Sequence, residues 1–421
     1  MAGTSSQSLA ATEVSRPASG RWTATGDPQV EARVDEVMGV VVDRVLHHFR
    51  PAVPLAIIAG GSAARGEVSY LVEPRGGGRF LSDLDLPVIV ADDSEAREIQ
   101  ARLPALLRRL HAEEGIRAVR IHVDAGPISY LALRRVPPTL FWYELAHGAC
   151  TLWGNKNVLA ELPRRRPQEL NADEGWILLN NRLIEWLTLD EASQGGVSEE
   201  VAYTVARSGT DLAKALLLIQ GDYSVSTAER AEKLTRLAAT SAIPGLDLRE
   251  LAADVRGWTE TKLRPTVSRL RDGAGLDRLG RWLLLLGSWS GHQRLGRRWT
   301  GSVEPPVFSS GPARARVRAW ASFLLRANRR DGRPLVDLTT VVTWAHRLPP
   351  LWVAYRAGSQ AAARRLGVAD ASAWPAPWSH LDREAQARRA VRLWERLALG
   401  GRHEAPIREA AQDPSEIAPA G

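Results

Sequence analysis

The sequence predicts an α+β domain followed by a region built only of helices, and three observations carry this prediction. Apolar residues recur at helical spacing from Val30 to Phe49 and again from Asp92 to Glu113. Two short apolar runs, at 55–59 and 84–90, have the length of strands and are bounded by glycine or polar residues. Beyond residue 167 the chain shows only helical patterns.

The two predicted strands carry the residues with the clearest chemistry. The first ends in Gly60-Gly61-Ser62, and the second contains Ser82-Asp83-Leu84-Asp85. Because a strand places alternate residues on opposite faces, Asp83 and Asp85 project together. Two neighbouring carboxylates repel each other, and their oxygens suit a hard cation such as Mg²⁺. The glycines let the backbone approach a ligand closely, so their N–H groups and the Ser62 hydroxyl can bind phosphate.

This pair of motifs resembles the nucleotidyltransferase superfamily of the DNA polymerase beta type, especially its small bacterial members and the aminoglycoside nucleotidyltransferases. The first motif reads Gly61-Ser62-Ala63-Ala64-Arg65-Gly66-Glu67, and the second reads Ser82-Asp83-Leu84-Asp85. The resemblance implies a nucleotidyltransferase-type mixed sheet with flanking helices, followed by an all-α helical region. The site residues that it implies are Gly60, Gly61, Ser62 and Ser82 for the nucleotide, Asp83 and Asp85 for metal, and Arg65 to brace the loop or contact the phosphates.

Members of this superfamily use a third carboxylate from a later strand. Segment 118–124 alternates polar and apolar residues, so Arg120, His122 and Asp124 share one face of a predicted strand. Asp124 is therefore the candidate third metal ligand and the candidate acceptor of the proton from the attacking hydroxyl. Alternatively, Asp124 only ends the strand before the turn at Gly126-Pro127.

A downstream segment, 141–155, also resembles part of the small nucleotidyltransferases. It predicts a helix that ends at Gly148, a short strand, and a tight turn at Gly154. His147 near the helix C-terminus is interpreted as serving the helix dipole, and Glu144 as structural. Cys150 is interpreted as a small core residue.

The predicted helical region carries one further candidate ligand. Asn171 predicts the N-cap of a helix, and a second helix is predicted from Val201 to Gln220. The stretch from Tyr203 to Arg230, which includes Tyr223, resembles the appended helices that complete nucleotide or acceptor binding in relatives. Within it, Lys214 either reaches the triphosphate or forms an ordinary ion pair with Asp211.

Breaks in these patterns predict the domain organisation. We expect a disordered leader at 1–28, a catalytic domain at 29–167, a helical bundle at 168–300, a linker at 301–312, a second helical region at 313–400 and a disordered tail at 401–421. An arginine-rich stretch within 314–333 is interpreted as a solvated helix face in preference to an RNA-binding patch.

Composition excludes several other classes of protein. The 421 residues are 44% hydrophobic and 24% charged, as in ordinary globular proteins. The single cysteine excludes a disulfide framework or a cysteine-rich zinc site. No apolar run reaches the roughly 20 residues that span a bilayer, and the leader lacks the apolar core of a signal peptide. We therefore expect a cytoplasmic protein with no membrane partner, and its net charge of +7 is too modest to favour nucleic acid.

The resemblance implies a Mg²⁺-dependent nucleotidyltransferase. It would transfer NMP, with ATP as the favoured donor, to a hydroxyl acceptor and release pyrophosphate. Two Mg²⁺ ions, or Mn²⁺ in their place, would be held by Asp83, Asp85 and Asp124. The acceptor could be a small hydroxylated molecule, a protein side chain or an RNA end. The alternative is a nucleotide-binding regulatory scaffold that kept the fold and lost the chemistry.

Overall fold

The structure is a computed structural model of the whole chain. It describes residues 14–50, 53–73, 77–193, 198–272, 275–294, 296–299, 301, 318–321, 323, 336, 340, 350–368 and 376–398. The predicted linker at 301–312 apart from residue 301, the predicted tail at 401–421 and most of the arginine-rich stretch lie outside these residues.

The chain divides into two compact units, and the first of them is built from three separate segments. The first unit consists of Met1–Glu174, Gln220–Arg236 and Asp254–Gly273, and the second consists of Gly175–Ile219, Leu237–Ala253 and Ala274–Gly421. The segment predicted as the catalytic domain, 29–167, therefore belongs to a unit that also takes up two segments of the predicted helical region.

A four-stranded mixed sheet forms the centre of the first unit. Its strands are β1 (Ala56–Ala59), β4 (Leu84–Val90), β5 (Val123–Ser129) and β6 (Cys150–Gly154), in the order β5-β4-β1-β6. β1 runs antiparallel to both β4 and β6, whereas β4 and β5 run parallel. The mixed sheet flanked by helices confirms the α+β prediction for this part of the chain.

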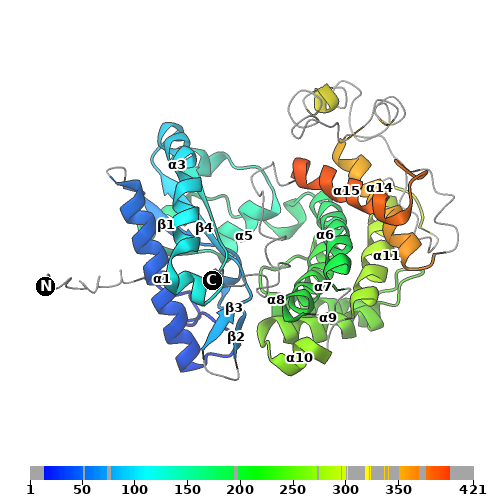
Figure 1. Cartoon of the computed structure of the whole chain (residues 1–421), viewed down its shortest axis with the longest axis horizontal. Helices are drawn as coiled ribbons and strands as arrows, with labels where there is room; N and C mark the ends of the chain where they lie inside the picture. Colours follow the sequence, from blue (N-terminus) through cyan, green and yellow to red (C-terminus); the bar gives the residue numbers. More distant parts are fainter. Residues whose placement is uncertain are drawn as a thin grey trace, which may run out of the picture. The chain divides into compact units, whose positions relative to one another are not determined.

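Helices cover both faces of this sheet (Figure 1). On one face, α1 (Pro28–Phe49) and α3 (Asp93–Ala112) pack against Ile57 of β1 and against alternate residues of β4 such as Leu84 and Leu86. On the other face, α5 (Leu140–Gly148) packs against Ile58 of β1 and Ile89 of β4. All four residues of β1 are buried, because its two faces contribute to two separate cores.

Capping explains where the two large helices of the first unit begin. The Asp27 carboxylate accepts hydrogen bonds from the first N–H groups of α1, and Asp92 does the same for α3. Both helices were predicted from their apolar spacing, and the structure confirms them within two residues of the predicted ends.

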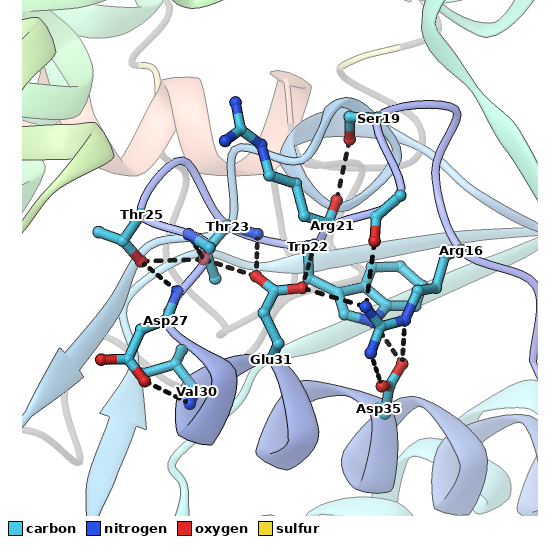
Figure 2. A network of polar contacts seen from close by, with 12 residues as sticks. Arg16, Ser19, Arg21, Trp22, Thr23, Thr25, Asp27, Val30, Glu31 and Asp35 are labelled. Atoms are coloured by element: carbon cyan, nitrogen blue, oxygen red, sulfur yellow. Dashed lines mark hydrogen bonds and ion pairs between the residues drawn. The ribbon is translucent and has the colours of Figure 1, made fainter.

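The residues that precede α1 are ordered against it, so the prediction of a disordered leader is wrong for residues 14–28. Trp22 is completely buried in the core of α1 and the sheet. The Glu31 carboxylate accepts the backbone N–H groups of Trp22 and Thr23 at 2.7 and 2.8 Å (Figure 2). Composition suggested disorder because this segment is rich in small polar residues, but one tryptophan and one buried carboxylate fix its path.

Two short elements connect β1 to β4. α2 (Gly61–Arg65) follows β1 directly, and a hairpin of β2 (Tyr70–Val72) and β3 (Gly78–Phe80) comes next. The Tyr70 and Phe80 rings pack edge to face across the hairpin, with centroids 5.3 Å apart. The long connection between the two sequence motifs is therefore a hairpin; residues 74–76 at its tip, including Gly76, lie outside the described residues.

The predicted strand at 118–124 is wrong over most of its length. Residues Glu114–Ala118 form a helical turn, α4, and Arg120 has a positive φ of 50°, which no strand tolerates. The strand begins only at Val123 and continues to Ser129. The alternation of polar and apolar residues at 118–122 thus comes from the end of a helical turn and a residue with left-handed backbone conformation. For this reason the predicted strand starts earlier than the observed one.

The regular elements that the structure describes after Asp173 are all helices, as predicted. The helices are α6 (Asp173–Ser193), α7 (Glu199–Ile219), α8 (Thr227–Thr240), α9 (Leu248–Leu263), α10 (Val267–Asp272), α11 (Leu276–Arg294), α14 (Pro350–Arg365) and α15 (Arg383–Ala398). The Asn171 side chain accepts the N–H of Asp173 at 3.0 Å, which confirms Asn171 as a capping residue. Among the described residues, no helix combines the length and apolar character that a membrane span requires.

Candidate functional site

The sheet brings two of the predicted metal ligands into direct register. Asp85 on β4 and Asp124 on β5 are paired residues of the parallel ladder, so their strands set them about 5 Å apart. Asp83 lies two residues before Asp85 and therefore projects from the same side. Since Leu84 and Leu86 point into the opposite core, the three carboxylates lie on the face that α5 covers, and all three side chains are exposed to solvent.

The electrostatic state of Asp85 reflects this crowding. The pKa of Asp85 is raised to about 6, first because the surrounding protein displaces water and then because Asp83, Asp124 and Glu144 repel its negative charge. Arg65 acts in the opposite direction and is too weak to cancel the effect. An aspartate whose charge is destabilised both by loss of water and by neighbouring carboxylates is a position where a cation is favoured.

The carboxylates of Asp83, Asp85 and Asp124 are suitable ligands for a hard divalent ion, and their positions along β4 and β5 bring them near one another. Asp83, Asp85 and Asp124 offer only carboxylate oxygens, which are the ligands that Mg²⁺ prefers. In the part of the chain that the structure describes, however, no three His, Cys, Asp or Glu side chains converge closely enough to hold a metal ion. The strands therefore bring the carboxylates to one part of the sheet without arranging them as a closed metal site.

The glycine loop is packed directly against Asp85. The Gly60 N–H donates to the Asp85 carbonyl oxygen at 2.9 Å, which fixes the loop beside β4. Gly61 has a φ of +55°, and a Cβ atom there would lie 2.4 Å from Asp85 Oδ2. Only glycine satisfies both conditions. The Ser62 hydroxyl forms no hydrogen bond within the described residues, and the first N–H groups of α2 have no partner inside the helix.

Arg65, at the end of α2, is held by a buried carboxylate that the sequence analysis did not single out. Its Nε donates to Glu67 Oε2 at 3.0 Å, and only 10% of the Arg65 side chain and 7% of the Glu67 side chain are exposed. Burial alone would raise the pKa of Glu67, but the positive charges of Arg65, Lys262 and Arg230 outweigh burial and lower the pKa to about 2. Arg65 is therefore fixed at the end of α2 by an ion pair with Glu67, and its contact with phosphate stays a prediction.

Glu67 also binds the start of α8, from much later in the chain. Its Oε1 accepts the Thr227 N–H at 2.7 Å and the Ser226 hydroxyl at 3.2 Å, and its Oε2 accepts the Thr227 hydroxyl at 2.8 Å. A single glutamate in a glycine-rich motif gives no sequence signal for this role, because its partners lie about 160 residues away.

A second carboxylate, Glu144 on α5, is tied to the same later segment. The Tyr223 hydroxyl donates a hydrogen bond to Glu144 Oε1, and Tyr223 is 1% exposed. The Arg230 guanidinium lies over the Tyr223 ring at 5.6 Å and donates to the Val225 carbonyl at 2.6 Å. The last part of the stretch 203–230, which by resemblance was expected to complete the site, thus contacts Glu67 and Glu144 through Thr227 and Tyr223.

Three further residues that the sequence analysis discussed, Ser82, Lys214 and His147, lie outside this cluster of carboxylates. Ser82, expected to bind nucleotide, is 8% exposed, and its hydroxyl accepts the Ser69 N–H at 2.9 Å, which joins the hairpin to the approach of β4. Lys214 lies on α7 in the second unit, and its contact with the triphosphate stays a prediction. His147 stacks on Tyr143 and contacts the Arg165 carbonyl oxygen at 3.0 Å, in keeping with a structural role.

Comparison with known proteins adds no assignment: the chain matches no protein-family model, no curated protein and no solved structure. The function therefore has to be argued from the residues themselves.

Proposed function

We propose that the protein is a Mg²⁺-dependent nucleotidyltransferase, which transfers NMP from a nucleoside triphosphate, with ATP favoured, to a hydroxyl acceptor. The observation that carries the proposal is the pairing of Asp85 with Asp124 across β4 and β5, with Asp83 on the same side and Gly61 packed against Asp85. Structural aspartates have no reason to crowd at one point of a sheet, because each destabilises the charge of its neighbours.

Each group has a distinct part in this reaction. Asp83, Asp85 and Asp124 would hold the divalent ions, whose chemistry is to neutralise charge on the phosphates and to favour the deprotonated acceptor oxygen. The backbone N–H groups at Gly61 and Ser62, together with the Ser62 hydroxyl, would bind the triphosphate. The acceptor oxygen forms a bond to the α-phosphorus, the bond to pyrophosphate breaks, and the hydroxyl proton leaves to a carboxylate, for which Asp124 is the candidate.

A second candidate function is a regulatory scaffold that binds nucleotide without transferring it. One observation favours this alternative: the three aspartate side chains do not converge on a single metal position among the described residues. The two candidates differ in one measurable product, which is pyrophosphate.

The test is pyrophosphate release from each of the four nucleoside triphosphates, with Mg²⁺ or Mn²⁺ and with cell extract as the source of acceptor. Wild type is compared with Asp83→Ala and with Asp93→Ala, a control at an exposed position in the first turn of α3. We expect release from wild type and the control, and none from Asp83→Ala. Nucleotide binding without release would support the scaffold, and equal release from all three proteins would refute the proposed site.

A further inference from the structure

The segment that precedes α1 packs against the end of the glycine loop. We call residues 15–26 the strap and residues 60–66 the glycine loop. The Trp22 carbonyl oxygen of the strap accepts the Val68 N–H at 2.9 Å, and Thr23 forms a parallel β-bridge with Val68. The Trp22 side chain is completely buried in the core cluster that also includes two alanines of α2. The strap therefore holds the chain just after the glycine loop.

A second contact between the strap and the loop lies at Gly66. A Cβ atom there would lie 2.8 Å from the Arg21 carbonyl oxygen and 2.6 Å from Ser19 Oγ. The φ of Gly66 is +70°, a backbone conformation that glycine adopts without strain. The backbones of the strap and the loop are thus packed together with no room for a side chain between them.

These two contacts fix the part of the loop to which the proposed function assigns the triphosphate. Glu67 lies between them, and its N–H donates to the Ser62 carbonyl oxygen at 2.9 Å. The Gly66 N–H donates to the Ala63 carbonyl oxygen at 3.4 Å. Both hydrogen bonds close the short helix α2, so the direction of the backbone N–H groups at Gly61 and Ser62 depends on the position of the chain after the loop.

The strap is anchored on α1 by a buried carboxylate (Figure 2). Glu31 Oε2 accepts the Trp22 N–H at 2.7 Å, and Oε1 accepts the Thr23 N–H at 2.8 Å and the Thr23 hydroxyl at 2.7 Å. Only 8% of the Glu31 side chain is exposed. Asp35, one turn further along α1, accepts the Trp22 indole N–H at 2.6 Å and pairs with Arg16. Both oxygens of Glu31 face donors, so a glutamine would oppose at least one donor with its own NH₂ group.

We propose that Glu31 is a positioning residue for triphosphate binding: through the strap, it holds the glycine loop in the conformation that binds phosphate. This inference rests on the proposed function, which assigns the triphosphate to the same loop. Glu31 acts through the backbone of Trp22 and Thr23, and from there through Val68. Because coupling between two sites is reciprocal, a phosphate ligand on the loop should in turn stabilise the strap.

The first test is hydrogen exchange of the ligand-free protein, followed peptide by peptide by mass spectrometry. Glu31→Gln is compared with wild type and with Glu36→Gln, the same substitution on the same helix at a side chain that is 60% exposed and pairs with Arg33. A second control, Asp92→Ala, removes the N-cap of α3 and lies outside the strap and the glycine loop. All proteins are measured well below their melting temperatures.

We expect Glu31→Gln to speed exchange at least about tenfold in peptides 19–25 and 62–68, the size expected when a buried charged acceptor is lost. Glu36→Gln should exchange as wild type does, and Asp92→Ala should exchange faster in α3 alone. Unchanged exchange at 62–68 in Glu31→Gln would overturn the inference. The same result follows if Asp92→Ala speeds exchange at 62–68 equally, because general loss of stability then explains the effect.

The second test is calorimetric binding of tripolyphosphate with Mg²⁺, which needs neither an acceptor nor catalysis. Glu31→Gln should bind at least about tenfold more weakly than both controls, the size of one lost charge-assisted hydrogen bond. In wild type, tripolyphosphate should also slow exchange in the strap peptide 19–25. Equal affinity of Glu31→Gln and wild type would overturn this inference alone. A wild type that binds no tripolyphosphate would refute the assignment of the triphosphate to the loop, and the inference with it.

Discussion

Replacing Glu67 by glutamine should lower the stability of the first unit. Among replacements of one residue of the segment 60–67 by an uncharged residue of similar size, we expect this one to have the largest effect. The change keeps the size of the side chain and removes the negative charge that Arg65, Lys262 and Arg230 share. The pKa of Glu67 falls from 4.5 to about 2, and at about 1.4 kcal/mol per tenfold change in proton affinity this is worth about 3 kcal/mol. Only 7% of the side chain is exposed, so screening by solvent reduces this value little.

The assay is thermal unfolding of wild type and Glu67→Gln across the acid range. For a domain of this size, about 3 kcal/mol corresponds to a Tm that is about 6–12 °C lower. Because the pKa of Glu67 is lower in the folded protein, its stabilisation is complete above the unfolded value of 4.5 and is lost as the pH falls to about 2. The difference in Tm should therefore be full at neutral pH and vanish in strong acid.

A matched control is Glu232→Gln on α8. Its carboxylate is 71% exposed and lies 3.9 Å from Arg236, so its loss should shift the Tm hardly at all. The reasoning is refuted if Glu67→Gln and Glu232→Gln melt together at pH 7. It is also refuted if the Glu67→Gln difference is as large at about pH 2 as at pH 7, since most of the stabilisation by the ionised carboxylate is then lost.

Three further predictions follow from the same residues. Gly61→Ala should abolish triphosphate binding, because its Cβ would lie 2.4 Å from Asp85 Oδ2 and its φ is +55°; equal binding by calorimetry would contradict this. Asp85→Asn should raise the Tm of the metal-free protein at pH 7, since a pKa raised from 3.8 to about 6 means that the ionised carboxylate destabilises the fold at any pH above that range. Mg²⁺ should then raise the Tm of wild type but not of Asp85→Asn, and a metal-free Asp85→Asn protein less stable than wild type would count against the crowding of carboxylates. A chain ending at residue 174 should fail to fold cooperatively in a calorimeter, because Glu67 would lose the partners at the start of α8 and Ser69 would lose the Lys262 carbonyl; a sharp unfolding transition would show that the later segments are dispensable.

Local pattern was enough to predict the part of the fold that carries the aspartates. Period-two alternation predicted that Asp83 and Asp85 project to one side, and helical spacing predicted the two helices that the structure shows as α1 and α3. These features depend on residues close together in the chain, where side-chain direction follows from the backbone.

Features that depend on distant partners were not predictable in the same way. The residues next to Glu67 in the sequence do not indicate that its carboxylate binds the N-terminus of α8. Likewise, the residues next to Trp22 do not indicate that its side chain packs in the core beneath α1. The predicted start of β5 was wrong because the pattern of polar and apolar residues does not reveal the left-handed backbone conformation of Arg120. Asp124 nevertheless lies beside Asp85, since the strand begins in time to include it.

The three-segment composition of the first unit has a consequence for the order of events during synthesis. Its sheet, from β1 to β6, leaves the ribosome long before Thr227 and Lys262 are translated, so Glu67 and Arg65 first meet without their remaining partners. A nascent chain at that stage holds a polar cluster that is better left in water than buried. Glu67 and Ser69 therefore gain their later partners only after α8 and α9 have emerged from the ribosome.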